Sequence, residues 1–349
     1  MTGGGRRFAR RGKGVAELTG QDVVQRQEHR FPVKVLLYAV WIASGLLFWH
    51  VGYALCAPVD PEASLSWASG GRILAGFVPV ALLAGLTAGA ATAVAGRWAV
   101  DAGVFAAAVG LSTLSVRGGT VEHLLLRRAD AGAGSRGLAV SFAGEALAWI
   151  AVFVLAGWIS GRVARMLGLT GQRETSGASA LMTMLDGFTA LRERLPSSRA
   201  ECVTGLTHAV VAGALAAALT IVFCVDLARR PVSHGQAIFV CSASAWLATY
   251  FTFKRFPVRT ALYPAVGVAA ACVVGYLIAM LSGGKADLPP NLPSSPFLRA
   301  LPMQAVAGAI GGSLLGFWFA FDPGVFAARE GSEGAAAPSD VSKKARGRR

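Results

Sequence analysis

Charged residues are scarce in this chain, where Asp, Glu, Lys and Arg together make up 15% of 349 residues. Soluble domains carry about 25% charged residues. The hydrophilic pieces are also short, and none reaches the roughly 50 residues of a minimal folded domain. These absences exclude an attached ATPase, kinase or nucleic-acid-binding domain, so we expect no nucleic acid among the partners.

Catalytic and ligand-binding motifs are also lacking. The sequence contains no HExxH and no GxSxG, and its one glycine-rich candidate for a phosphate loop, residues 132–137, lacks the Lys-Ser/Thr ending. The five cysteines, at 56, 202, 224, 241 and 272, show no CxxC spacing and are expected to be small packing residues. We therefore expect no enzymatic activity, no cofactor and no bound metal.

Apolar residues dominate instead, at 54% of the chain with a mean hydropathy of +0.53. They form eight runs, each near the roughly 20 residues that a helix needs to cross a bilayer. The sequence predicts an all-α, polytopic transmembrane bundle of about eight spans in two groups of four, residues 33–161 and 205–321. The spans are expected at 33–57, 73–95, 99–116, 138–161, 205–227, 235–253, 260–281 and 302–321, of which the third and sixth are the shortest.

Three hydrophilic segments surround these groups. Residues 1–32 and 322–349 are basic and are expected to be disordered tails. Residues 162–204 link the two groups, and the leucines, Met184 and Phe188 between 181 and 195 recur at spacings of three and four. This pattern predicts an amphipathic helix at 179–195 that lies along the cytoplasmic face of the membrane.

The distribution of Lys and Arg predicts the orientation. With the N-terminus inside, the inner segments carry 24 of these residues and the outer segments carry 9. This bias favours a multi-pass protein of the plasma (inner) membrane with both termini in the cytoplasm. One outer loop disagrees, because it contains Arg117, Arg127, Arg128 and Arg136.

Glu145 is the clearest polar residue inside a predicted span, where an ionisable side chain is costly and needs a reason. It lies seven residues from the outer end of its span, and His50 lies at the same depth in the first span. The sequence therefore suggests a pair of Glu145 with His50. The two residues would form either a proton- or cation-coupled site, or a buried polar pair, or they would make separate hydrogen bonds that hold the bundle together.

Glycine is abundant, with 43 residues, and several glycines recur at intervals of four. Glycines four apart share one face of a helix and let another backbone approach closely. Such rows are Gly308, Gly312 and Gly316 in the last span, and Gly85 and Gly89 in the second. They predict either oligomerisation, with a second copy or another membrane protein as partner, or helix packing within one chain.

Two functions remain compatible with the sequence. The first is a non-enzymatic role in structure, assembly or partner binding within the lipid bilayer. The alternative is a small secondary transporter or ion- or proton-coupled permease with its site near His50 and Glu145. Transport would require a polar cavity near the middle of the membrane.

Overall fold

The computed structural model describes residues 30–60, 62–70, 72–95, 99–130, 135–169, 199–224, 233–258, 260–282 and 295–320. Within these ranges every element is a helix, as the sequence predicts. The predicted amphipathic helix at 179–195 lies outside the described residues, and so do the two predicted tails apart from residues 30–32. The division of the chain into domains therefore stays a prediction.

The elements follow one another as helices of very different length. The short ones are the π-helix η1 (Phe48–Gly52), α3 (Tyr53–Cys56), the 3-10 helices η2 (Trp67–Ser69) and η5 (Pro296–Arg299), and α6 (Val121–Asp130). The long ones are α2 (Arg30–Leu47), α4 (Arg72–Ala95), α5 (Ala99–Ser115), α7 (Ser135–Met166), α9 (Arg199–Cys224), α10 (His234–Arg255), α11 (Leu262–Ser282) and α12 (Pro302–Ala320).

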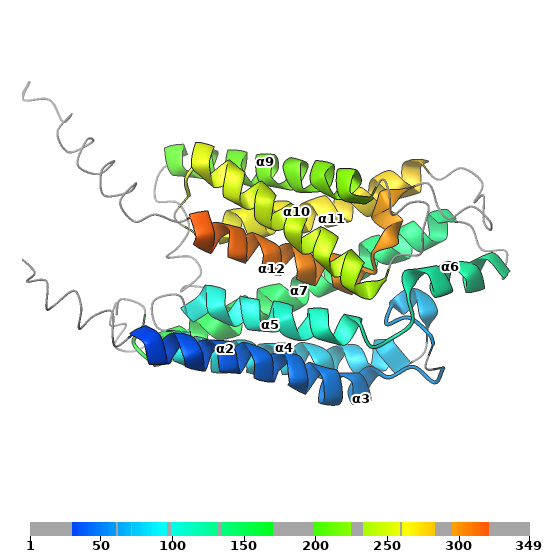
Figure 1. The fold of residues 1–349 in the computed structure, drawn as a ribbon, viewed down its shortest axis with the longest axis horizontal. Helices are drawn as coiled ribbons and strands as arrows, with labels where there is room; N and C mark the ends of the chain where they lie inside the picture. Colours follow the sequence, from blue (N-terminus) through cyan, green and yellow to red (C-terminus); the bar gives the residue numbers. More distant parts are fainter. Residues whose placement is uncertain are drawn as a thin grey trace, which may run out of the picture.

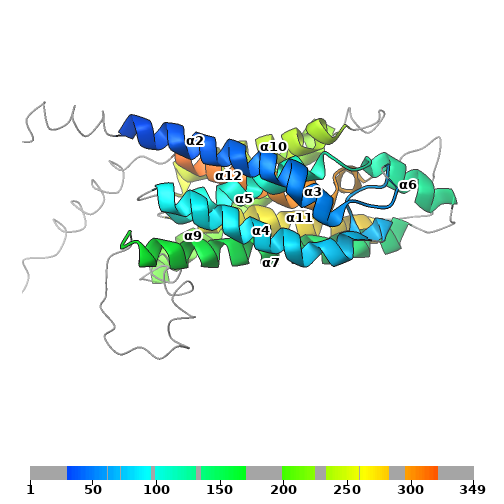
Figure 2. The same ribbon diagram turned by 90° about the horizontal axis from the view of Figure 1, so that it is seen from below.

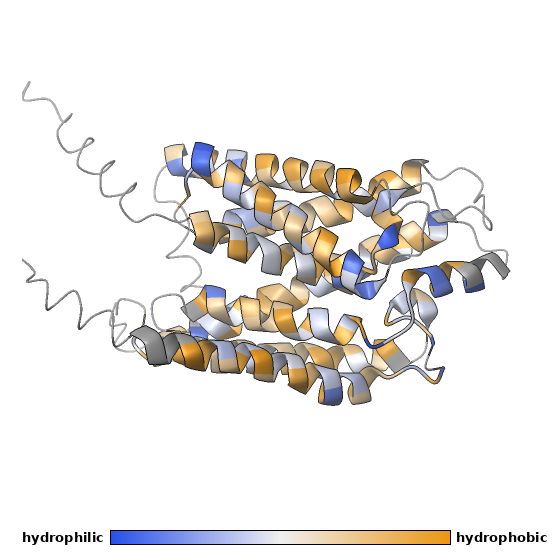
Figure 3. Cartoon of the chain, in the orientation of Figure 1, coloured by the Kyte–Doolittle hydropathy of each residue, from blue (hydrophilic) through white to orange (hydrophobic). Residues whose placement is uncertain are grey.

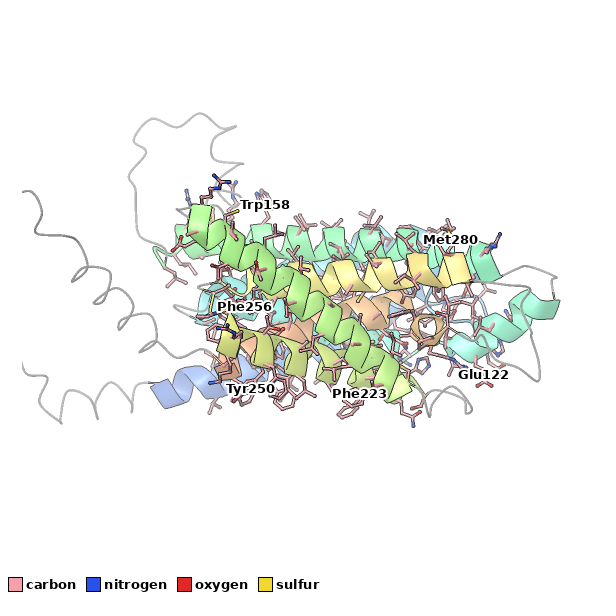
Figure 4. The ribbon with its side chains drawn as sticks, turned by 90° about the horizontal axis from the view of Figure 1, so that it is seen from above. Glu122, Trp158, Phe223, Tyr250, Phe256 and Met280 are labelled. Atoms are coloured by element: carbon pink, nitrogen blue, oxygen red, sulfur yellow. The ribbon has the colours of Figure 1, made fainter. Side chains whose placement is uncertain are left out.

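The long helices run along one common direction (Figures 1 and 2). In Figure 1, α2, α4 and α5 form one layer and α9, α10 and α11 another, with α7 and α12 joining them. The short elements α6, η2 and η5 gather at one end, which we call the α6 end. Figure 4 marks this end by Glu122 and Met280, and the opposite end by Trp158 and Phe256.

In the part of the chain that the structure describes, seven helices are long and apolar enough to cross a membrane, and their ribbons are mostly coloured as hydrophobic in Figure 3. The sequence predicts eight spans, and the one that falls short is α5, which has 17 residues. At 1.5 Å per residue it is about 25 Å long, a little less than a hydrocarbon core of about 30 Å. These helices fit a multi-pass membrane protein.

Several helices extend further than the sequence predicts. The helix α2 begins at Arg30 rather than at residue 33, and α7 continues to Met166 into the predicted linker. The helix α9 already begins at Arg199, before the predicted start at 205, and α6 forms in a segment predicted as a loop. Hydropathy marks only the part of a helix that matches the apolar core, so polar turns beyond it escape such a prediction.

The helix α12 is the centre of the bundle, because 83% of the residues in its apolar stretch are buried. Its glycine row faces α10. A methyl group at Gly312 would meet the carbonyl oxygen of Ser242, and one at Gly316 would meet that of Trp246. At Gly308 the nearest atom would be the hydroxyl oxygen of Ser242, at 3.1 Å. This glycine row therefore packs within one chain.

The shorter row on α4 has the same role. Added methyl groups at Gly85 and Gly89 would meet the side chain of Ile159 on α7, and Gly89 also faces Val163 at 3.5 Å. Both predicted glycine rows are therefore occupied by neighbouring helices of the same chain. A second copy as partner stays a prediction that these contacts do not support.

Replacing Gly312 by Ala should destabilise the bundle by about 1–3 kcal/mol, because the new methyl group is forced against the backbone of α10. Gly144 on α7 is a matched control, since nothing lies within 4 Å of an added methyl group there. Gly144→Ala should be neutral or stabilising by up to about 1 kcal/mol. Equal unfolding temperatures of the two variants in detergent would contradict this packing.

Candidate functional site

Glu145 is completely buried on α7 and accepts three hydrogen bonds. Its Oε2 accepts from the hydroxyl of Ser66 at 2.6 Å and from the backbone N–H of Trp67 at 2.9 Å. Its Oε1 accepts from the indole N–H of Trp149, one turn further along α7, at 3.1 Å. The carboxylate thus fastens the loop that follows α3 to α7.

The surroundings of this carboxylate are aromatic. Phe77 of α4 packs edge-on against Trp149 at 5.1 Å between ring centroids, and against Trp67 at 5.4 Å. Ser66 also accepts a hydrogen bond from the N–H of Ala68, which holds its hydroxyl in place at the start of η2. We call Glu145 and its three hydrogen-bond donors, Ser66, Trp67 and Trp149, the carboxylate clamp.

The described contacts do not pair Glu145 with His50, and Glu145 makes separate hydrogen bonds instead. His50 lies in the π-helix η1 and is exposed, whereas Glu145 is fully buried and bonded to other residues. Equal depth places two residues on one level of a bundle but leaves the rotation of each helix open. The burial of Glu145 is confirmed, and its contacts agree with the alternative of separate hydrogen bonds.

A second polar cluster joins three helices at the α6 end. The side chain of Gln304 donates to the carbonyl of Ser115 at 3.2 Å and lies 2.7 Å from Nδ1 of His234. Its Oε1 accepts from the N–H of Leu301 at 3.1 Å. Gln304 therefore ties the starts of α10 and α12 to the end of α5. Sequence reasoning missed it, because a single Gln at a span end carries no pattern.

A groove of about 450 Å³ lies among α5, α7, α11 and α12. We call it the lateral groove. Its floor contains the buried Phe153, Ala269, Ile310 and Leu314. Its rims are exposed on the outside of the bundle: Leu147 is 57% exposed, Val154 52%, Val266 54% and Val274 50%. The groove is therefore open sideways, toward the lipid.

Polar side chains line the lateral groove at one end. Asp101, in the first turn of α5, and Thr260, just before α11, are both buried and lie away from the α6 end. Arg165 follows Val154 of the groove rim by about three helical turns, so it points to the same side of α7. The groove thus runs from an aliphatic middle to a charged end.

A smaller cavity of about 50 Å³ lies among α9, α10, α11, α12 and η5. Three of the five cysteines line it, namely Cys224, Cys241 and Cys272. No three His, Cys, Asp or Glu side chains are arranged to hold a metal ion in the part of the chain that the structure describes. That no metal or cofactor binds stays a prediction.

Comparison with known proteins gives no relative from which a function could be inferred. The chain matches no family model, no curated protein and no solved structure. The candidate sites therefore rest on geometry alone.

The carboxylate clamp predicts which substitutions matter at this end of the bundle. Glu145→Gln places an amide donor among the donors of the clamp, so it should cost about 1–3 kcal/mol of stability. Ser66→Ala should cost less, and the two losses should not add in the double variant, because both remove the same contact. The measurement is thermal unfolding of the detergent-solubilised protein.

His50→Gln is the control, and it should change stability by no more than about 0.5 kcal/mol because His50 is exposed. A loss as large as that of Glu145→Gln, and non-additive with it, would restore the pair of Glu145 with His50 and contradict the clamp.

Proposed function

We propose that this protein is a non-enzymatic, multi-pass protein of the plasma (inner) membrane that binds the acyl chain of a lipid inside the bilayer. The lateral groove carries this proposal. Its volume of about 450 Å³ falls within the range of small-molecule pockets, about 300–1,000 Å³. Its rims face the surface that the bilayer covers, so a ligand reaches it from the lipid and needs an apolar segment to fill it.

The polar residues support binding rather than catalysis. Catalysis requires a nucleophile and a base within reach of one another and of a shared substrate position. Glu145 is engaged by Ser66, Trp67 and Trp149. The groove is lined by aliphatic side chains except for Phe153, Asp101 and Thr260. None of these described residues forms a catalytic pair.

The alternative, a small secondary transporter, had its site near His50 and Glu145. The carboxylate of Glu145 accepts its hydrogen bonds from Ser66, Trp67 and Trp149 and not from His50. These bonds fix a loop and do not leave the carboxylate open to a solute. No contact that we describe favours transport over binding, so we propose binding.

We further propose eight spans in two groups of four, with the α6 end outside and both termini in the cytoplasm. Two of the four arginines that oppose the charge bias, Arg117 and Arg127, have other contacts at the α6 end. Arg117 donates to the carbonyl of Trp49 at 2.8 Å and lies over the rings of Trp49 and Tyr53, at 4.8 and 4.4 Å. An arginine held by such contacts is used for packing as well as for orientation.

Arg127 is a second example, because it forms an ion pair with Asp60. The N–H of Glu62, and after it the Arg127 guanidinium, hold the pKa of the Asp60 carboxyl below its ordinary value. The pair is therefore charged at neutral pH, which suits a position in water outside the membrane.

Reporter fusions after residues 120, 180, 232 and 290 test this orientation. We expect them to report outside, inside, outside and outside, because α5 completes a crossing despite its 17 residues. An inside signal at 120 would show that α5 does not cross the membrane and would contradict the eight-span arrangement.

Binding in the lateral groove is tested by filling it. Ala270 lines the groove from an exposed position on α11, so Ala270→Trp should fill the space without displacing the core. The protein purified in mild detergent should retain a lipid, seen as a mass adduct in native mass spectrometry, and Ala270→Trp should lose it.

Ala90→Trp is the matched control, because Ala90 is an exposed alanine of α4 that does not line the groove. This variant should retain the lipid as the unchanged protein does. Equal retention by both variants, or no retained lipid on the unchanged protein, would overturn the proposed function.

A further inference from the structure

We infer that the lateral groove limits the length of the acyl chain that it binds, and that it has room for a myristoyl or a palmitoyl chain. The methyl end of this chain stops inside the bundle, where α7 and α11 pack against each other. This inference rests on the proposed function, since it names the class of chain that the groove binds. It depends on the length of the groove and on the nature of its two ends.

The described lining of the groove has a definite length. On α7 it extends from Leu147 to Gly157, which is about 15 Å at 1.5 Å per residue. On α11 it extends from Leu262 to Val274, about 18 Å. An extended peptide gains at most about 3.6 Å for its three backbone bonds per residue, so an extended acyl chain gains about 1.2 Å per bond. The groove therefore matches about 12–15 bonds, which is the range of myristoyl and palmitoyl chains.

One end of the groove is near the surface of the membrane. Gly157 lies at this end, and the adjacent Trp158 marks it in Figure 4, away from the α6 end. Asp101 and Thr260 lie at the same end, where α5 and α11 begin. The acyl chains of a bilayer lipid extend from the membrane surface toward its middle. The ester end of a bound chain therefore lies here, and its methyl end points toward α6.

The other end of the groove is closed by protein. Leu147 and Ile150 are the last described groove residues on α7 in this direction. Four positions before them, Ala143 and Ala146 lie on the same face of the helix, about one turn closer to α6. They are 6% and 0% exposed, whereas Leu147 is 57% exposed. The face of α7 that lines the groove is therefore covered by other residues beyond this point.

Two aromatic rings show which helices meet there. Phe142 of α7 and Tyr276 of α11 pack edge-on with 5.4 Å between their ring centroids, and both are buried. The hydroxyl of Tyr276 donates to the carbonyl of Ala300 at 2.9 Å, which holds this ring in place. We call the contact of Phe142 with Tyr276 the end wall. Because protein interiors are closely packed, an acyl chain cannot continue between the two helices at this level.

The end wall makes binding depend on chain length. A chain that is too short leaves the deep part of the groove without partner atoms and loses dispersion contacts there. A chain that is too long has to bend out through the open side, so its last part also loses contacts with the protein. Additional methylene groups gain little from transfer, since lipid tails are as apolar as the protein side chains. The affinity should therefore pass through a maximum as the chain grows longer.

The experiment offers the delipidated, full-length protein an equimolar mixture of phosphatidylcholines in detergent. Each lipid has two identical chains, which are lauroyl, myristoyl, palmitoyl, stearoyl or arachidoyl. Native mass spectrometry distinguishes the bound lipids by their mass. We expect the myristoyl and palmitoyl lipids to be bound at least about threefold more than the lauroyl and arachidoyl lipids. Binding that rises steadily with chain length, or that does not depend on it, would overturn the length limit.

A bulky side chain placed near the end wall tests where the bound chain stops. Val274 is exposed and lies four residues, or about 6 Å, beyond Ala270 on α11. Val274→Trp should shorten the groove by up to about 6 Å, or about five bonds, so the lauroyl lipid should become the best bound. Leu147→Trp places the same obstacle on α7 and should give the same change. Retained lauroyl lipid also shows that each variant is folded.

Val210→Trp is the matched control, because Val210 is an exposed valine of α9 that does not line the groove. This variant should keep the preference of the unchanged protein for myristoyl and palmitoyl lipids.

The outcomes separate this inference from the proposed function. A preference that neither Val274→Trp nor Leu147→Trp changes toward the lauroyl lipid overturns the end wall. If Ala270→Trp still abolishes lipid binding in that case, acyl binding in the groove remains intact. Binding that Ala270→Trp does not affect overturns the proposed function as well.

Discussion

Close approach of helix backbones is the constraint on which this bundle depends. In lipid, helices gain little by hiding apolar side chains from one another, so association depends on van der Waals contact between closely packed surfaces. A methyl group at Gly267 of α11 would meet the carbonyl oxygen of Ala209 on α9, and one at Gly312 would meet that of Ser242. With 43 glycines, the chain can repeat such contacts between many of its helices.

Polar contacts add a second constraint, and they make the two ends of the bundle different. Glu145 fixes the loop after α3, and Gln304 joins α5, α10 and α12, both in the half of the bundle toward α6. A buried polar group that loses its partner costs about 1–3 kcal/mol, so these contacts resist separation of the helices. The lateral groove has its polar end on the other side, where Asp101 and Thr260 lie.

The sequence predicts the helices well and their contacts poorly, for a physical reason. Apolar length identifies a span, and the cost of a charge in lipid correctly predicts that Glu145 is buried. Its partner Ser66 lies in a short loop without periodicity, so nothing in the sequence leads to it. Glycine spacing likewise identifies the packing face of α12 but not that α10 covers it. The groove was not predicted, because it depends on side chains from four helices.

The groove follows from how α11 distributes its small residues. Its glycines serve other neighbours, since Gly267 faces α9 and Gly275 faces Phe297 of η5. Alanines at 261, 265 and 269, four residues apart, face the groove, where they leave space without bringing α7 closer. Because this space is open to the outside of the bundle, it does not carry the free-energy cost of an enclosed cavity in a protein core, and small side chains on α11 can form it without loss of packing elsewhere.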